Sequence, residues 1–310
     1  MENRQVRALI EQADSCRRSH DWATAIDLLK RALAIDAEHA QAHGTLALAL
    51  LGARRLHGAV IEADLALAFD ANDPFCHYAV AAVRAAERKL DDAWKHVLVA
   101  LHDDDADADT HVLAAHVKVL MGERDAARTL LDEALAIDGD HVDALTELAS
   151  LDLHEGHLAE AQLRIATALA IDPSDVDAHI TAGYIAIRAG KLEDAEHHAR
   201  FALQENASDR GALELWTALK ARRNVFLGLW WRINSFAALR SERAQIGIMI
   251  GSFVVVRLLV IVLGALGYED IEIFLERAWL GLCAYSWFAP EIFEWMLKRE
   301  LKTVVLSDDY

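Results

Sequence analysis

Apolar and small residues recur at helical spacing, three or four positions apart, through the first two-thirds of the chain. Segments such as "AIDLLKRALAI" (25–35) and "VDAHITAGYIAIRAG" (176–190) show this pattern, which is typical of helices that pack through one face. Short polar turns such as "DAEH", "DGDH" and "DPSD" separate the segments, and their Asp, Gly and Pro residues break helices. The pattern predicts a mostly helical protein built from pairs of helices.

The predicted helix pairs repeat with a period of 34 residues. Three columns of identical residues keep this period through six copies: Ala25, Ala59, Ala93, Ala127, Ala161 and Ala195; Ala32, Ala66, Ala100, Ala134, Ala168 and Ala202; Leu33, Leu67, Leu101, Leu135, Leu169 and Leu203. We interpret the alanines as contact points where two helix backbones come too close for a larger side chain. A fixed period of this length indicates a repeat protein.

With this period, "GHLAEA" (156–161), "GKLEDA" (190–195), the Ala-Leu pair seven residues beyond each final Ala and Pro173 in a turn, the chain resembles the tetratricopeptide repeat (TPR) family. The resemblance covers six repeats, residues 3–209, with 210–221 as a capping helix. It implies an all-α solenoid with a concave groove that binds a protein or peptide, and no catalytic activity.

The chain departs from the family pattern in the first helix of each repeat. The family's aromatic residue there is replaced, and of the small glycines only Gly183 is kept. The Asn and Lys positions that clamp a peptide carboxylate in chaperone-binding members have no counterpart, so binding of a chaperone tail is not expected. The residues that replace the aromatic are His43, His77, His111, Leu145 and His179. We interpret the four histidines as packing residues rather than metal ligands.

The family register also predicts which side chains face the groove. These positions combine acids with a few aromatic residues, and such a groove favours a basic or amphipathic partner segment. They are Phe75, Tyr78, Asp109, His116, Asp143, Asp177, Tyr184 and Arg188.

Charge is distributed unevenly, and this narrows the range of partners. The formal net charge is −18. Residues 1–221 contain 21 Lys and Arg against 39 Asp and Glu, whereas residues 222–310 contain 10 of each. An acidic body repels phosphate backbones, so nucleic acid is not an expected partner. The three scattered cysteines form no disulfide framework and fit a reducing compartment.

Two short motifs suggest metal chemistry but do not meet its requirements. "HEGH" (154–157) lacks the second His four residues on that a zinc protease needs, so we expect His154 and His157 to be surface residues. "DDDADAD" (103–109) lacks the Gly and Glu of a calcium loop and is interpreted as an acidic turn that supplies helix N-caps, with a weak cation site as the alternative. We predict no metal, no cofactor and no enzymatic activity.

The repeat register stops after residue 221, and the composition changes. Residues 222–243 carry five arginines and place Trp230 and Trp231 among apolar residues. This is typical of an amphipathic helix at a membrane interface; a basic helix packed under the last repeat is the alternative. Residues 244–268 contain "IGIMIGSFVVVRLLVIVLGALGY", in which Arg257 is the single charge. Its 23 residues would rise about 34 Å, enough to span a bilayer.

A second apolar helix is predicted at residues 273–297, either as a second span or as a re-entrant or interfacial helix. Bases precede the first span and follow the second helix, and the turn between them is acidic. The positive-inside rule then predicts a hairpin with the repeats and the tail, residues 298–310, on the cytoplasmic side. The N-terminal residues lack a signal-peptide pattern, which agrees with this side. The Ala-rich composition favours a bacterial inner membrane.

Arg257 requires a partner if it lies at mid-bilayer, because its insertion costs about 2.5–3.5 kcal/mol. It could pair with Glu291 of the second helix, reach the headgroups alone, or pair with an acid on another membrane protein. Two functions follow. The chain is either a membrane-anchored scaffold that presents its groove to a protein, or an integral subunit or assembly factor whose hairpin contacts partner helices. Self-association through the groove is a third option.

Overall fold

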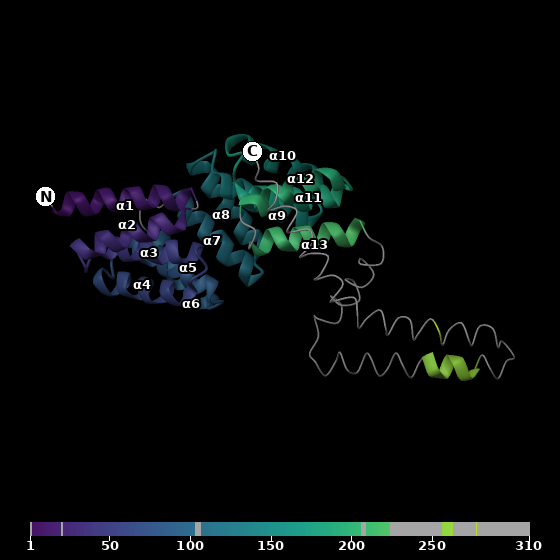
Figure 1. Cartoon of the computed structure of the whole chain (residues 1–310), viewed down its shortest axis with the longest axis horizontal. Helices are drawn as coiled ribbons and strands as arrows, with labels where there is room; N and C mark the ends of the chain where they lie inside the picture. Colours follow the sequence, from purple (N-terminus) through teal and green to yellow (C-terminus); the bar gives the residue numbers. More distant parts are fainter. Residues whose placement is uncertain are drawn as a thin grey trace. The chain divides into compact units, whose positions relative to one another are not determined.

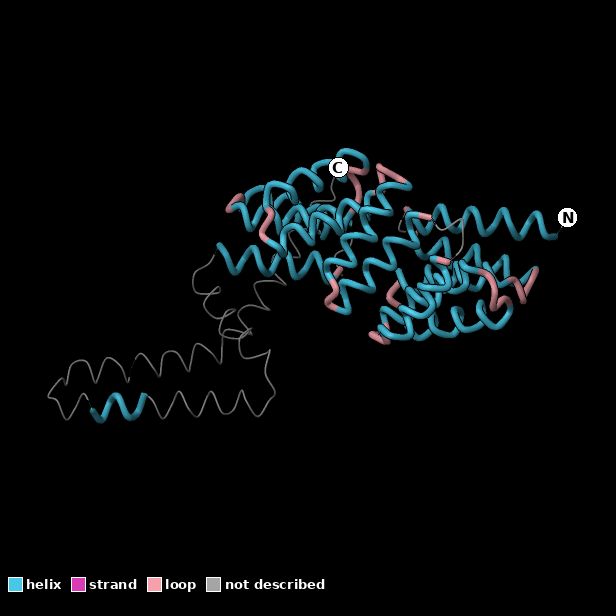
Figure 2. Tube along the Cα trace, turned by 180° about the vertical axis from the view of Figure 1, so that it is seen from behind, coloured by secondary structure: helices cyan, strands magenta, loops and turns pink. Residues whose placement is uncertain are grey.

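The computed structural model describes residues 2–19, 21–102, 107–205, 209–223, 256–262 and 277. The chain divides into two compact units, Met1–Pro173 and Ser174–Tyr310. Every regular element among the described residues is a helix, and Figure 2 draws the described connections between helices as short loops. The predicted all-α solenoid is therefore confirmed for this part of the chain.

Thirteen helices are described between residues 2 and 223, and Figure 1 labels them in chain order. The first unit holds α1 (Glu2–Arg18), α2 (Trp22–Ile35), α3 (Ala40–Gly52), α4 (Leu56–Phe69), α5 (Pro74–Ala86), α6 (Leu90–Leu101), α7 (Ala108–Met121), α8 (Arg124–Ile137), α9 (Val142–Glu155) and α10 (Leu158–Ile171). The second holds α11 (Val176–Ala189), α12 (Leu192–Glu205) and α13 (Arg210–Arg223).

The two alanine columns lie where the helices of a pair meet. All twelve of these alanines are at most 3% exposed. In the first unit each odd-numbered helix also contacts the next odd-numbered helix, so α1, α3, α5, α7 and α9 form one continuous layer. A methyl group at these positions lets two backbones approach closely, which explains why the chain repeats alanine rather than a larger apolar residue.

The turn inside five of the helix pairs, from α3–α4 to α11–α12, contains a residue in the left-handed conformation. Gly122, Gly156 and Gly190 take this position in the later pairs, with φ between 78° and 91°. Arg54 (φ 60°) and Arg88 (φ 63°) take it in two earlier pairs. Glycine adopts this conformation freely, whereas a side chain makes it unfavourable. Two of the first unit's turns are therefore strained.

In the second unit α13 packs over α11 and α12. Leu215 of α13 lies against Gly183 of α11, where any Cβ atom would collide with the Leu215 side chain. Trp216 is 2% exposed in the same core. Gly183 is the one glycine of its column that the chain retains, and the close approach of α13 is the physical reason.

The predicted membrane segments fall almost entirely outside the described residues, as do Trp230, Trp231 and Glu291. Residues 256–262 are helical: Val260 is 5% exposed, while Leu258, Leu259, Ile261 and Val262 are 48–65% exposed. Within the part of the chain that is described, no helix has the length and apolar character required to cross a membrane.

Candidate functional site

A pocket of about 400 Å³ opens in the first unit among α1, α3, α5 and α7. We call it the α1/α7 pocket. The helices that line it are the first members of their pairs, apart from Ala100 near the end of α6. Their side chains form an aromatic floor, an acidic wall from α7 and a wall with two arginines from α1. A cavity of this size accommodates a few side chains of a partner segment.

The aromatic floor consists of Phe75 and Tyr78 of α5. Their rings are stacked, with centroids 6.2 Å apart and planes 16° from parallel. Phe75 packs on the backbone of α3 at Gly44, where a Cβ atom would come within 2.9 Å of the ring. Burial, with the nearby charge of Asp109, raises the pKa of Tyr78 well above its usual value. The floor is thus an aromatic surface with a neutral hydroxyl.

The acidic wall is the start of α7. Asp107 is the N-cap of this helix, because its carboxylate accepts hydrogen bonds from the Thr110 amide (2.9 Å) and hydroxyl (2.8 Å). This confirms the predicted capping role within the acidic turn. Asp109 accepts a hydrogen bond from Nε2 of His141 at 2.9 Å, which lowers the pKa of Asp109 and raises that of His141. Two carboxylates therefore border the pocket here.

The opposite wall carries Arg17 and Arg18, at the end of α1. Both bind the single carboxylate of Asp14: Arg17 Nε lies 2.9 Å from Oδ1, and Arg18 Nη2 lies 2.5 Å from Oδ2. The last turn of a helix favours cations, so the arginines also stabilise α1. Two guanidiniums share one carboxylate, which leaves the C-terminal end of α1 with an excess positive charge.

Three of the eight predicted groove residues meet in the α1/α7 pocket: Phe75, Tyr78 and Asp109. His116 of α7 is exposed and lies 3.2 Å from a carboxylate oxygen of Glu147 in α9, and Asp143 is exposed in the first turn of α9. The other three, Asp177, Tyr184 and Arg188, belong to α11 in the second unit, where Tyr184 packs against the core. The predicted set did not include Arg17, Arg18 or Asp14.

The histidine column forms paired contacts between helices. His43 and His179 are each 7% exposed, which confirms that these two are packing residues. Each partner lies 19 residues further along: His43 Nδ1 is 2.6 Å from Glu62, His77 Nδ1 is 2.9 Å from Nδ1 of His96, and His179 Nδ1 is 2.9 Å from Nδ1 of His198. His77 Nε2 also lies 3.1 Å from the carbonyl oxygen of Ala71. The rings join the helices of a pair.

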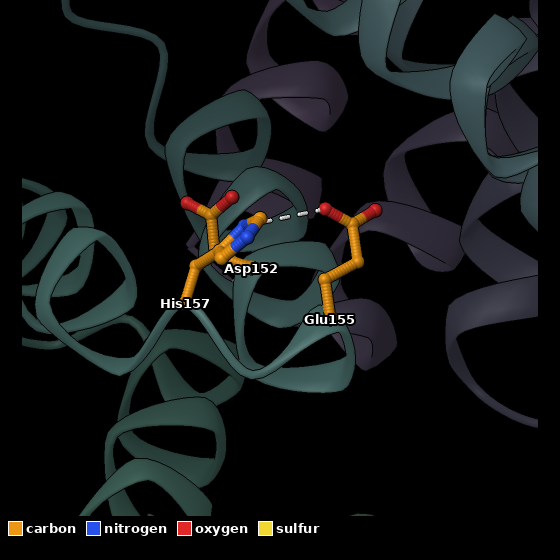
Figure 3. Close-up of side chains that lie close together, drawn as sticks. All are labelled: Asp152, Glu155 and His157. Atoms are coloured by element: carbon orange, nitrogen blue, oxygen red, sulfur yellow. Dashed lines mark ion pairs between the residues drawn. The ribbon is translucent and has the colours of Figure 1, made fainter.

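Ligand-type atoms of Asp152, Glu155 and His157 lie within 4.8 Å of one another (Figure 3). Asp152 is 2% exposed, and its oxygens accept from Arg128 Nη2 at 2.8 Å and Arg164 Nε at 2.9 Å. A cation here would compete with two guanidiniums for the same carboxylate, so the group does not suit a metal ion. It is an ion-pair network that joins α8, α9 and α10. His154 and His157 are exposed, as predicted.

Residues 118–179 match the model of a protein family described as tetratricopeptide repeat. A comparison with curated proteins finds no match.

Two solved structures share the fold over most of their own length. PilW, described as a widely conserved type IV pilus biogenesis factor, is 16% identical with a TM-score of 0.51, over 68% of this chain and 98% of that protein. TTC0263, described as a thermophilic TPR protein in Thermus thermophilus, is 23% identical with a TM-score of 0.52, over 58% and 98%. At these identities the likeness concerns the fold.

Proposed function

We propose that this chain, a tetratricopeptide repeat protein, is a non-catalytic scaffold that holds a segment of a protein partner in its α1/α7 pocket. The observation that carries the proposal is the convergence of Phe75, Tyr78 and Asp109 on one cavity bordered by charged walls. An aromatic floor supplies contact area at a low entropic cost, and the charged borders supply specificity. The acidic wall favours a basic or amphipathic segment.

Co-purification from intact membranes tests the scaffold. Tyr78→Ala removes half of the aromatic floor and should abolish the recovery of proteins that accompany the wild-type chain. Leu163→Ala is the matched control, because Leu163 is 71% exposed on α10 and does not line the pocket. If the two variants retain the same proteins in the same amounts, the pocket is not the partner site.

We further propose that residues 244–268 and 273–297 anchor the scaffold in a membrane as a hairpin, in a bacterial inner membrane, with the repeats and the tail on the cytoplasmic side. The 22 uncharged residues around Arg257 support this, as do the exposed Leu258 and Ile261 (57% and 65%) in the described helical turn. Transfer of such side chains from water into lipid is favourable. The anchor would raise the local concentration of the partner at the bilayer.

Alkaline extraction of membranes tests the anchor, since an integral hairpin stays with the lipid. A reporter fused after residue 310 tests the topology: cytoplasmic activity is expected, and activity on the opposite side would exclude the hairpin.

An integral subunit or assembly factor of a membrane complex is the second candidate, and Arg257 is the observation that favours it. This residue is exposed in an apolar helical turn. If residues 244–268 span a bilayer, a charge at position 257 would be stabilised by an acid such as Glu291 or one of another protein. Replacing residues 222–310 with an unrelated hairpin of the same topology separates the candidates. Retained function supports the scaffold, and lost function supports the subunit.

A further inference from the structure

The α7 wall of the α1/α7 pocket and the C-terminal end of α1 carry opposite charge. Asp107 and Asp109 face the cavity from α7, and Asp109 is bound to a basic side chain, His141. Arg17 and Arg18 face it from α1, and both are paired with Asp14. Formal charges therefore sum to −2 for Asp107 and Asp109, or to −1 when His141 is protonated, and to +1 for the arginines with Asp14.

The separation of charge is maintained along α1. Glu11 also lines the pocket, but it precedes the two arginines by six and seven residues, which corresponds to about 10 Å along a helix. Its carboxylate therefore lies about two helical turns from the guanidiniums along α1 and neutralises them less than Asp14, which both arginines contact. The arginines also interact electrostatically with Asp109 across the cavity. The hydrogen bond from His141 is the main cause of the lowered pKa of Asp109, and the two positive charges lower it further.

We propose that the α1/α7 pocket selects a bipolar peptide segment: one apolar or aromatic side chain with a basic residue on one side of it and an acidic residue on the other. The apolar side chain packs on Phe75 and Tyr78. The basic residue lies at Asp107 and Asp109, and the acidic residue lies at Arg17 and Arg18. This inference rests on the proposed function and specifies the chemistry of the partner at the same site.

The physical reason is that each wall rejects the wrong charge. A second base placed at Arg17 and Arg18 meets two guanidiniums, and an acid placed at Asp107 and Asp109 meets two carboxylates. Like charges at an interface are unfavourable, whereas a correct pair adds a modest gain, so discrimination comes mainly from repulsion. Because the bipolar segment has no net charge, its affinity should also depend less on salt than that of a basic segment.

Labelled synthetic peptides test the proposal on the full chain in an uncharged detergent. The bipolar probe has one Phe with a Lys on one side and a Glu on the other, joined by glycine spacers. A basic probe has Lys in place of Glu, an acidic probe has Glu in place of Lys, and a fourth probe has Ala in place of Phe. The bipolar probe should bind at least about threefold more tightly than each of the others.

Charge reversal in the protein provides the decisive comparison. The double variant Arg17→Glu with Arg18→Glu should weaken the bipolar probe about three- to tenfold and make the basic probe the preferred ligand. Lys30→Glu with Arg31→Glu is the matched control: it changes the net charge equally, at exposed positions of α2 outside the pocket. The control should keep the wild-type order of affinities, and circular dichroism confirms that both variants are folded.

The outcomes separate this inference from the proposed function. If the basic probe binds the wild-type chain as tightly as the bipolar probe, the pocket is a basic-peptide site and the bipolar assignment is wrong. The assignment is equally wrong if no probe binds while Tyr78→Ala still abolishes co-purification, although the scaffold function then stands. If no probe binds and Tyr78→Ala has no effect, both are wrong.

Discussion

Acidification should weaken the contact between α11 and α12, because it protonates His198, whose Nδ1 forms a hydrogen bond with Nδ1 of His179. The two Nδ1 atoms lie 2.9 Å apart, so one nitrogen donates a hydrogen bond and the other accepts it. A proton on the accepting nitrogen places two N–H donors face to face. Burial, followed by the charge of His179, lowers the pKa of His198 from 6.5 to about 4.

The sign and size of the effect follow from this pKa. A histidine whose pKa is lower in the folded state favours the folded state above pH 6.5, and this contribution is lost as the pH falls towards about 4. At about 1.4 kcal/mol for each pKa unit, this difference sets an upper bound of roughly 3 kcal/mol. Solvent screening at the half-buried ring reduces the expected loss to about 1–2 kcal/mol, a factor of about 5–30 in the opening equilibrium.

Hydrogen exchange measured by mass spectrometry on the full chain reports this loss locally. Between pH 7 and pH 4.5, and after correction for intrinsic rates, amides in α11 and α12 should lose protection relative to those in α9 and α10. His198→Gln should remove most of this relative change. His197→Gln is the comparison: this exposed ring makes only the third contribution to the lowered pKa of His198 and does not form the hydrogen bond to His179, so the variant should keep most of the relative change. If the ratio of amide protection in α11 and α12 to that in α9 and α10 is the same at pH 7 and pH 4.5, the reasoning is refuted.

Three substitutions test other parts of the fold. Asp152→Ala leaves two partly exposed guanidiniums without their carboxylate and should lower the free energy of unfolding by about 2–3 kcal/mol in urea titrations; a loss under about 1 kcal/mol would contradict the network's role. In thermal melts, Arg88→Gly should stabilise the chain by about 0.5–1 kcal/mol and Gly122→Ala should destabilise it by a similar amount, because both positions are left-handed. If both substitutions stabilise the chain, or both destabilise it, the strain argument is wrong. Gly183→Val should displace α13 and increase exchange there, and adding Leu215→Ala should restore protection; no rescue would mean that the collision is not the cause.

The repeat architecture could be predicted because alanine recurs for one physical reason. Each column position is a helix contact with room for a methyl group, and the period therefore appears directly in the sequence. The histidine pairs were also within reach, since His77 and His96 are separated by the same 19 residues as His179 and His198. The hydrogen bonds between their rings depend on side-chain orientation, which a one-dimensional pattern does not contain.

The α1/α7 pocket was predicted in part, and the missing part has a clear origin. The family register identified Phe75 and Tyr78. Gln41 is equivalent to Phe75 one repeat earlier, Ile10 is equivalent to Tyr78 two repeats earlier, and both also line the cavity. That signal was available. The approach of α1 to α7 could not be predicted from the sequence, because it results from small rotations added over successive repeats. The register of a single repeat therefore does not reveal that Arg17 faces the acids of α7.

Photo-crosslinking from position 78 in intact cells tests the central claim most directly. A photoreactive aromatic residue replaces Tyr78 at the pocket floor, and the same residue replaces the exposed Arg31 as the control. The account predicts a discrete crosslinked partner from position 78 that is absent at position 31 and disappears when Arg17 and Arg18 are reversed to glutamate. Crosslinks of equal yield and identity from both positions would contradict the assignment of the pocket as the partner site.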